Sequence, residues 1–313
     1  KKPEIISPAT DNIPKYIEMI TKLLKDGYAY ISGGNVYFDT SKYPDYYKLS
    51  GRNHDDLLLA VRDDVEVDNN KKNPFDFGLW FTDSKFNDQE LKWESPWGVG
   101  YPGWHIECSA IALTYLGEHL DIHCGGIDNI FPHHTNEIAQ SECYLGHKWC
   151  NYWIHMEFLN DASGKMSKFK GTSKDLRSLI QKGYDPVVYR FFCLQSHYRK
   201  TLVYSLEGLD TATNAYNKLK RRIKNIKENK EGTLNQKIIE KYQENFKEAF
   251  KNDMNTSLMI TTLYDVLKDE INNNTKLYLI EDFDKVLSLD LLKDEEIDKD
   301  FENYIKEKIQ ERT

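Results

Sequence analysis

The sequence lacks long apolar runs and has few cysteines, and both absences narrow the class of protein. No stretch approaches the ~20 apolar residues that span a bilayer, which argues against a membrane protein. The first residues, KKPEIISPATDNIPKY, contain no apolar core of a secretory signal. The five cysteines form no CxxC pair and no disulfide framework, which disfavours a zinc ribbon and favours reduced thiols. We therefore expect a cytoplasmic protein.

What is present is the composition of a globular protein. The chain has 313 residues, of which 40% are hydrophobic and 29% charged, so it is long enough for two or three domains. The formal net charge of −8 argues against indiscriminate nucleic-acid binding. A basic face on one part of the surface is still possible, because the net charge of a protein does not determine how its charged residues are distributed.

The hydrophobic pattern predicts alternating helices and strands, which is typical of an α/β domain. Apolar residues from Ile13 to Leu24 recur at helical spacing and predict a helix over 12–26. Gly33-Gly34, between YAYIS and NVYFDT, predicts a β-hairpin. Further helices are expected over 103–117, 132–145 and 173–195, strands over 119–126 and 149–159, short strands and loops over 41–102, and a helical region from about 205.

Three residues have the chemistry and partly the spacing of a metal site. His133 and Glu137, in the run FPHHTNEIAQSE, are four apart, so a helix would place them on one face with Cβ atoms about 5–6 Å apart. Cys108 lies upstream in the run GWHIECSA. Thiolate, imidazole and carboxylate are all zinc ligands. Spacing alone leaves open a surface His–Glu pair and an ordinary buried cysteine.

These two runs, together with KMSK at 165–168, resemble the second half of the catalytic domain of the cysteinyl-tRNA synthetase family. The resemblance covers most of 1–270 and is tightest at 95–172. It implies an α/β fold: part of a class I nucleotide-binding, Rossmann-like catalytic domain with a connective insertion, followed by an α-helical bundle. The implied domains are the connective insertion (1–95), the second half of the Rossmann-like domain (96–160), the KMSK loop and stem-contact region (161–204), and a tRNA-contacting bundle (205–313).

The resemblance also assigns a metal and its role. It implies that Cys108, His133 and Glu137 bind one zinc ion per chain, with a fourth, N-terminal cysteine ligand that no residue here matches. The substrate thiolate would be a further ligand, and because zinc favours sulfur over a hydroxyl, serine would be rejected. The implied residues near the metal are Trp104 and His123 in the cysteine pocket and His134 as a support for the metal ligand.

Further matches concern ATP, which the family uses with Mg²⁺. Lys165 and Lys168 would stabilise the charge that builds on phosphoryl oxygens during amino-acid activation, with Lys168 also binding ATP. Phe169 stands where the family has serine, so we expect altered packing of this loop. Gly126 and Asp128 follow a predicted strand and would meet the ribose of ATP. A lone GGxD run is otherwise an ordinary turn.

One signature of the family is missing. Class I synthetases carry a His-x-Gly-His run that holds ATP phosphates, and no such run occurs here. We therefore interpret the sequence as beginning inside the connective insertion, with an N-terminal segment truncated or omitted. By itself, this chain is expected to have little or no activation activity.

The function implied is that of a monomeric ligase that activates L-cysteine to cysteinyl-adenylate with ATP and transfers it to tRNA(Cys). The run NKLKRRIKNIKENK at 217–230 has seven basic residues and one acidic one, which suits phosphate contacts, although a solvated charged helix fits it too. Two alternatives stay open. One is the related ligase that joins cysteine to an amino sugar in mycothiol synthesis without tRNA. The other is a non-catalytic fragment that keeps the zinc pocket.

Overall fold

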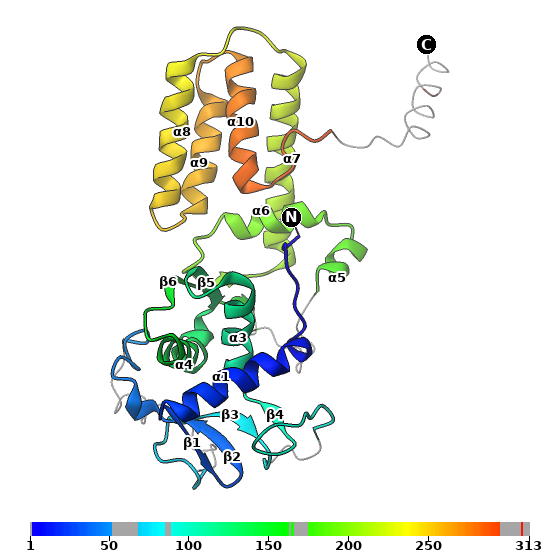
Figure 1. Ribbon diagram of the computed structural model, residues 1–313. Helices are drawn as coiled ribbons and strands as arrows, with labels where there is room; N and C mark the ends of the chain where they lie inside the picture. Colours follow the sequence, from blue (N-terminus) through cyan, green and yellow to red (C-terminus); the bar gives the residue numbers. More distant parts are fainter. Residues whose placement is uncertain are drawn as a thin grey trace. The chain divides into compact units, whose positions relative to one another are not determined.

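The computed structural model describes residues 2–51, 68–84, 89–162, 164–165, 175–294 and 308. The chain divides into two compact units, Lys1–Met156 and Glu157–Thr313 (Figure 1). Each unit has its own apolar core. Among the described helices, none combines the length and apolarity needed to cross a membrane.

The first unit opens with a helix packed on a small antiparallel sheet. Helix α1 (Ile13–Lys25) buries one apolar stripe, and Gly27 follows it with a φ of 81°, a left-handed conformation that favours glycine. Strands β1 (Ala29–Ser32) and β2 (Asn35–Phe38) form the predicted hairpin. Strands β3 (Phe77–Phe81) and β4 (Tyr101–Pro102) complete the sheet in the order β1-β2-β3-β4. The predicted helix and hairpin are confirmed.

The second half of this unit is a strand–helix–strand arrangement. Helix α3 (Trp104–Leu116) precedes β5 (Leu120–Gly126), and helix α4 (Thr135–Leu145) connects β5 to β6 (Cys150–Met156). The two strands pair in parallel, as a crossover through a helix requires. The expected helices and strands over 103–159 are therefore present, with an irregular turn, Ile130–His134, before α4.

The attachment of α3 to the sheet depends on a glycine. The Gly103 N–H donates to the carbonyl of Leu79 at 2.9 Å, and a Cβ at position 103 would overlap the carbonyl oxygen of Gly78. Only glycine allows this close approach of two backbones. The start of α3, and with it Trp104 and Cys108, is thereby fixed against β3.

The second unit begins with a three-stranded sheet, in the order β8 (Gly164–Lys165), β7 (Leu159–Asp161), β9 (Leu202–Val203). The prediction of a helix over 173–195 is wrong in the middle of that segment, where the helix is interrupted. The structure has α5 (Leu176–Gln181) and α6 (Pro186–Leu194). Gly183 has a φ of 85°, and Asp185 is extended because the residue before a proline disfavours the helical region.

The rest of this unit is a helical bundle, as expected from about 205. Helices α7 (Leu206–Glu228), α8 (Gln236–Lys251), α9 (Thr256–Lys268) and α10 (Asn273–Leu287) lie side by side (Figure 1). A side chain caps the start of each helix by accepting a backbone N–H, which stabilises helix ends. The capping residues are Ser205, Asn235, Asn255 and Asn272. The four-part domain division expected from the sequence stays a prediction.

Candidate metal and substrate site

The three predicted metal ligands lie together in the first unit. Cys108 comes from α3, His133 from the turn before α4, and Glu137 from the first turn of α4. One donor atom from each lies within 4.8 Å of the others. A sulfur, a nitrogen and an oxygen donor therefore converge from α3, the turn Ile130–His134 and α4.

Glu137 is the centre of this cluster and is completely buried. The Nε2 atom of His133 lies 2.9 Å from its Oε1, and Nε2 of His123 lies 3.2 Å from its Oε2. Neither contact has hydrogen-bond geometry, so within the described residues both carboxylate oxygens lack a hydrogen-bond donor. Burial alone would raise the pKa of Glu137, but its contacts with the two histidines outweigh burial and lower it to about 2.

Cys108 and Trp104 border the same cluster. Burial, together with the charges of Glu137 and Glu107, raises the pKa of the Cys108 thiol to about 12, so a bound cation is needed to favour the thiolate at neutral pH. The Trp104 ring stacks on His133 at a centroid distance of 4.0 Å and an interplanar angle of 16°. Trp104 is nevertheless 59% exposed, so its other face is available to a ligand.

Two further histidine pairs surround the cluster. His105 Nδ1 lies 2.7 Å from His133 Nδ1, and His134 Nδ1 lies 2.8 Å from His155 Nε2. Burial lowers the pKa of both His105 and His134 to about 3, so both rings are neutral at neutral pH. Sequence reasoning missed His105 and His155. The signal for His105 was its position three residues before Cys108, on the same side of a helix.

A second set of donors shares the central carboxylate. His123, His134 and Glu137 also bring one donor atom each within 4.8 Å of one another. This set contains no sulfur, whereas the first contains Cys108. Glu137 therefore lies between a thiol-containing set and an all-histidine set. The orienting role expected for His134 stays a prediction, and the ring nitrogen Nδ1 of His133 is hydrogen-bonded with His105 instead.

The predicted nucleotide-binding residues are divided between the units. Gly126 ends β5, the strand that carries His123, and Asp128 lies exposed in the next turn. Lys165 ends β8 in the second unit. Lys168 and Phe169 lie outside the described residues. The assignments of these residues to ATP stay predictions.

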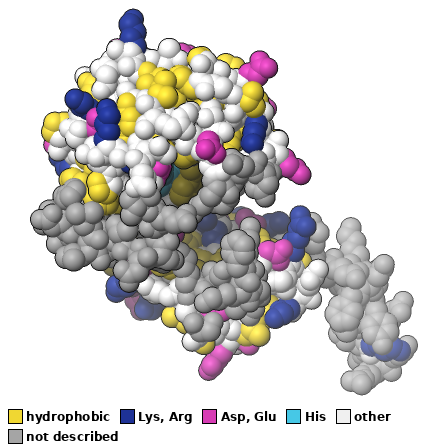
Figure 2. All heavy atoms as spheres, turned by 90° about the horizontal axis from the view of Figure 1, so that it is seen from below, with side chains coloured by type: hydrophobic (Ala, Val, Ile, Leu, Met, Phe, Trp, Pro, Cys, Tyr) yellow, Lys and Arg dark blue, Asp and Glu magenta, His cyan; other side chains and the backbone are white. Residues whose placement is uncertain are grey.

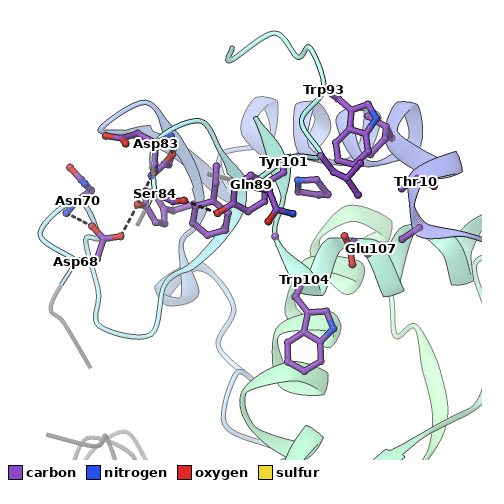
Figure 3. A pocket seen from close by; sticks show the side chains of 18 residues that line it. Thr10, Asp68, Asn70, Asp83, Ser84, Gln89, Trp93, Tyr101, Trp104 and Glu107 are labelled. Atoms are coloured by element: carbon purple, nitrogen blue, oxygen red, sulfur yellow. Dashed lines mark hydrogen bonds between the residues drawn. The ribbon is translucent and has the colours of Figure 1, made fainter. Parts of the chain in front are cut away.

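A cavity of about 920 Å³ in the first unit is lined in part by Trp104 and Glu107 at the start of α3 (Figure 3). Its wall carries aromatic rings, amides and the carboxylates of Asp68, Asp83 and Glu107. Among the described residues that line it there is no Lys or Arg. A carboxylate-lined wall repels phosphates, so this cavity is not where we expect the triphosphate of a nucleotide.

A family model described as "tRNA synthetases class I (C) catalytic domain" matches residues 1–214. The chain belongs to the cysteinyl family of class I tRNA synthetases. Its relatives include the cysteine–tRNA ligases of Treponema denticola (41% identical, covering 94% of this chain and 64% of that protein), Borreliella burgdorferi (40%, 96% and 65%) and Brevibacillus brevis (38%, 99% and 70%). The family predicted from the motifs is thereby confirmed.

Solved structures of other class I synthetases share the fold of this family member. A Mycobacterium tuberculosis methionyl-tRNA synthetase in complex with methionyl-adenylate has a TM-score of 0.56 at 14% identity, over 92% of this chain and 74% of that chain. A putative arginyl-tRNA synthetase from Campylobacter jejuni has 0.54 at 12%, over 92% and 63%. The predicted fold class is confirmed. The chain spans 64% and 65% of the lengths of the Treponema and Borreliella relatives.

Proposed function

We propose that this chain carries the amino-acid recognition half of a cysteine–tRNA ligase. The reaction is ATP- and Mg²⁺-dependent activation of L-cysteine to cysteinyl-adenylate, followed by transfer to tRNA(Cys). The observation that supports it is the convergence of Cys108, His133 and Glu137 within 4.8 Å, in a chain about 40% identical to cysteine–tRNA ligases.

The donor set fits a zinc ion. Zinc accepts sulfur, imidazole nitrogen and carboxylate oxygen together. The two oxygens of Glu137 are buried without a hydrogen-bond donor among the described residues, a state that is costly unless a cation or proton compensates it. When bound there, zinc would supply a borderline-soft centre that prefers a thiolate to a hydroxyl.

The chain's own residues shape the rest of the cysteine pocket. Trp104 stacks on His133 with one face and offers an apolar wall with the other, which suits a sulfur-containing side chain. His123 contacts Oε2 of Glu137 and limits the freedom of that carboxylate. His134 packs against His123, at 4.6 Å between ring centroids, and closes the pocket on the β5 side.

We assign contacts with ATP to the end of β5, and a separate role in the same reaction to the lysines of the KMSK run. Gly125 and Gly126 bring backbone close to His134 and Asp128, where a Cβ would lie 2.6 Å from His134 Cε1 or 2.5 Å from Asp128 Oδ1. The exposed Asp128 carboxylate is placed to accept hydrogen bonds from ribose hydroxyls. Lys165 and Lys168 would stabilise phosphoryl charge in the transition state.

The tRNA partner is assigned to one face of α7. Three of the seven basic residues at 217–230 are bonded to residues outside α7: Lys220 to the backbone carbonyls of residues 290, 291 and 293, Arg222 to the carbonyl of Leu267, and Lys227 to the Asp294 carboxylate. A fourth, Arg221, donates to the Asn217 carbonyl within the same helix. The phosphate-contacting set, which we call the α7 stripe, is the exposed trio Lys218, Arg221 and Lys224.

The α7 stripe is suited to phosphate contact by its spacing and its exposure. Its members are three residues apart, so they follow one face of the helix. Within the described part of the chain, no carboxylate lies at ion-pair distance from any of them. A stripe of this kind favours tRNA over the amino-sugar acceptor of the related cysteine ligase, which carries no phosphate backbone.

ATP–pyrophosphate exchange tests the proposed function, run with cysteine and with serine on this chain and on the full-length product of its gene. Bound zinc is counted in the same samples by elemental analysis. We expect the full-length protein to hold about one zinc and to exchange with cysteine only. The chain alone is expected to show little exchange. A full-length protein that holds zinc and shows no exchange would reduce the assignment to a zinc-bearing binding module.

A further inference from the structure

We propose that His105 is a positioning residue: its Nδ1 accepts a hydrogen bond from Nδ1–H of His133, which leaves Nε2 of His133 free to bind the metal. This inference rests on the zinc site proposed above. It concerns a residue outside the donor set, and it assigns the orientation and the tautomer of the nitrogen ligand.

The geometry of the two rings leaves little choice of hydrogen bond. The two Nδ1 atoms are 2.7 Å apart, a distance at which one proton is shared between a donor and an acceptor. The other nitrogen of His133, Nε2, faces the donor cluster and lies 2.9 Å from Oε1 of Glu137. A nitrogen that binds a metal carries no proton, so the ring proton of His133 must be on Nδ1. His105 is then the acceptor and carries its own proton on Nε2.

The His105 ring is itself held in place. It meets the ring of Phe77 edge-on, at a centroid distance of 5.4 Å and an interplanar angle of 85°. Its backbone carbonyl accepts a hydrogen bond from Nε2 of Gln140 at 2.6 Å, which ties the start of α3 to α4. Because Phe77 and Gln140 hold His105 in place, the hydrogen bond between His105 and His133 keeps one direction.

The His133 ring is constrained on its face as well as its edge. Trp104 stacks nearly parallel to it and fixes the ring plane, while His105 fixes the rotation of the ring within that plane. Together they orient Nε2 toward Glu137 before any ligand arrives. A preorganised ligand loses less conformational entropy on binding, so affinity increases.

The test compares zinc affinity in the full-length protein and two variants, measured by competition with a chromophoric chelator. His105→Phe keeps a planar ring but removes the acceptor, and we expect the zinc dissociation constant to rise about 10–100-fold. His105→Asn places a carbonyl oxygen near the former Nδ1, and we expect most of the affinity to return. His147→Phe is the matched control, because His147 contacts Glu118 and stacks on His119 outside the donor cluster, and its zinc affinity should stay close to that of the wild type.

A measurement on the wild-type protein tests the same proposal, so the test does not depend on the variants folding. Imidazole ¹⁵N NMR of the zinc-loaded wild type should show His133 with a protonated Nδ1 and a metal-bound Nε2, and His105 with an unprotonated Nδ1. A metal on Nδ1 of His133, an unchanged zinc affinity in His105→Phe, or an equal loss in His105→Asn would overturn the proposal. A wild-type protein that binds no zinc would overturn the zinc site itself, and this inference with it.

Discussion

At the scale of single residues, the site depends on one buried carboxylate. Glu137 has no exposed surface, and burial of a charge is costly unless partners compensate it. His123 and His133 supply part of that compensation, which is why the pKa of Glu137 lies near 2 despite burial. Neither Glu137 oxygen accepts a hydrogen bond from a described residue, so both oxygens can bind a cation.

Replacing this carboxylate should abolish tight metal binding. Glu137→Gln keeps the shape but removes the charge, so we expect zinc affinity to fall by more than the ~10–100-fold typical of residues that only support a ligand. Chelator competition measures the loss. Glu142→Gln is the matched control on α4, because Glu142 accepts from Tyr43 and from the Trp149 N–H, away from the donor cluster. Equal zinc affinity in the two variants would contradict the assignment.

The motifs predicted three residues that the structure brings together, but not the other contacts of the candidate site. Cys108, His133 and Glu137 could be found because their runs resemble a family and because a four-residue spacing shares a helix face. The bond between His105 and His133 joins residues 28 positions apart on different elements. No sequence period reports such a contact, since it depends on how α3 and α4 pack.

At the scale of elements, local signals predicted structure wherever one signal dominated. Gly33-Gly34 can adopt the backbone conformations of a hairpin turn, and the apolar stripe over 13–25 predicted a helix; the structure contains both. The segment expected to be helical over 173–195 contains two helices, α5 and α6. Gly183 and the Asp185-Pro186 pair interrupt it, and those breakers outweigh the pattern.

The registration of α3 against α4 depends on a buried polar contact. Gln140 Nε2 donates to the carbonyl of His105 and to Oγ of Ser109, each at 2.6 Å. Gln140→Ala removes both of these buried hydrogen bonds, so we expect the free energy of unfolding to fall by about 1–3 kcal/mol. Denaturant titration measures it. Gln236→Ala, at an exposed position on α8, should change it by less than about 0.5 kcal/mol, and equal effects would contradict this role of Gln140.

At the scale of the whole molecule, charge is mixed rather than uniform. The net charge is −8, and on the face shown in Figure 2 both basic and acidic side chains are scattered over the described surface. A count of basic residues overstated the capacity of α7 for RNA, because Lys220, Arg222 and Lys227 bond within the second unit. A charge count could not predict this, since it does not show which side chains face inward.

Removing the α7 stripe should weaken tRNA binding mainly through its salt dependence. For the triple variant Lys218→Ala/Arg221→Ala/Lys224→Ala, we expect the slope of log affinity against log salt to fall by roughly 2–3, at about 0.7–0.9 per phosphate contact. Filter binding over a salt series measures it. Lys220→Ala is the control and should reduce stability while leaving the slope unchanged. A slope unchanged in the triple variant would leave the stripe a solvated helix face.

In the function proposed here, zinc bound by Cys108, His133 and Glu137 recognises the thiol of the substrate. X-ray absorption at the zinc edge tests it most directly, on the full-length protein with no amino acid, with cysteine and with serine. We expect cysteine to add one sulfur neighbour at about 2.3 Å and serine to add none. A sulfur count that stays the same on addition of cysteine would contradict the account.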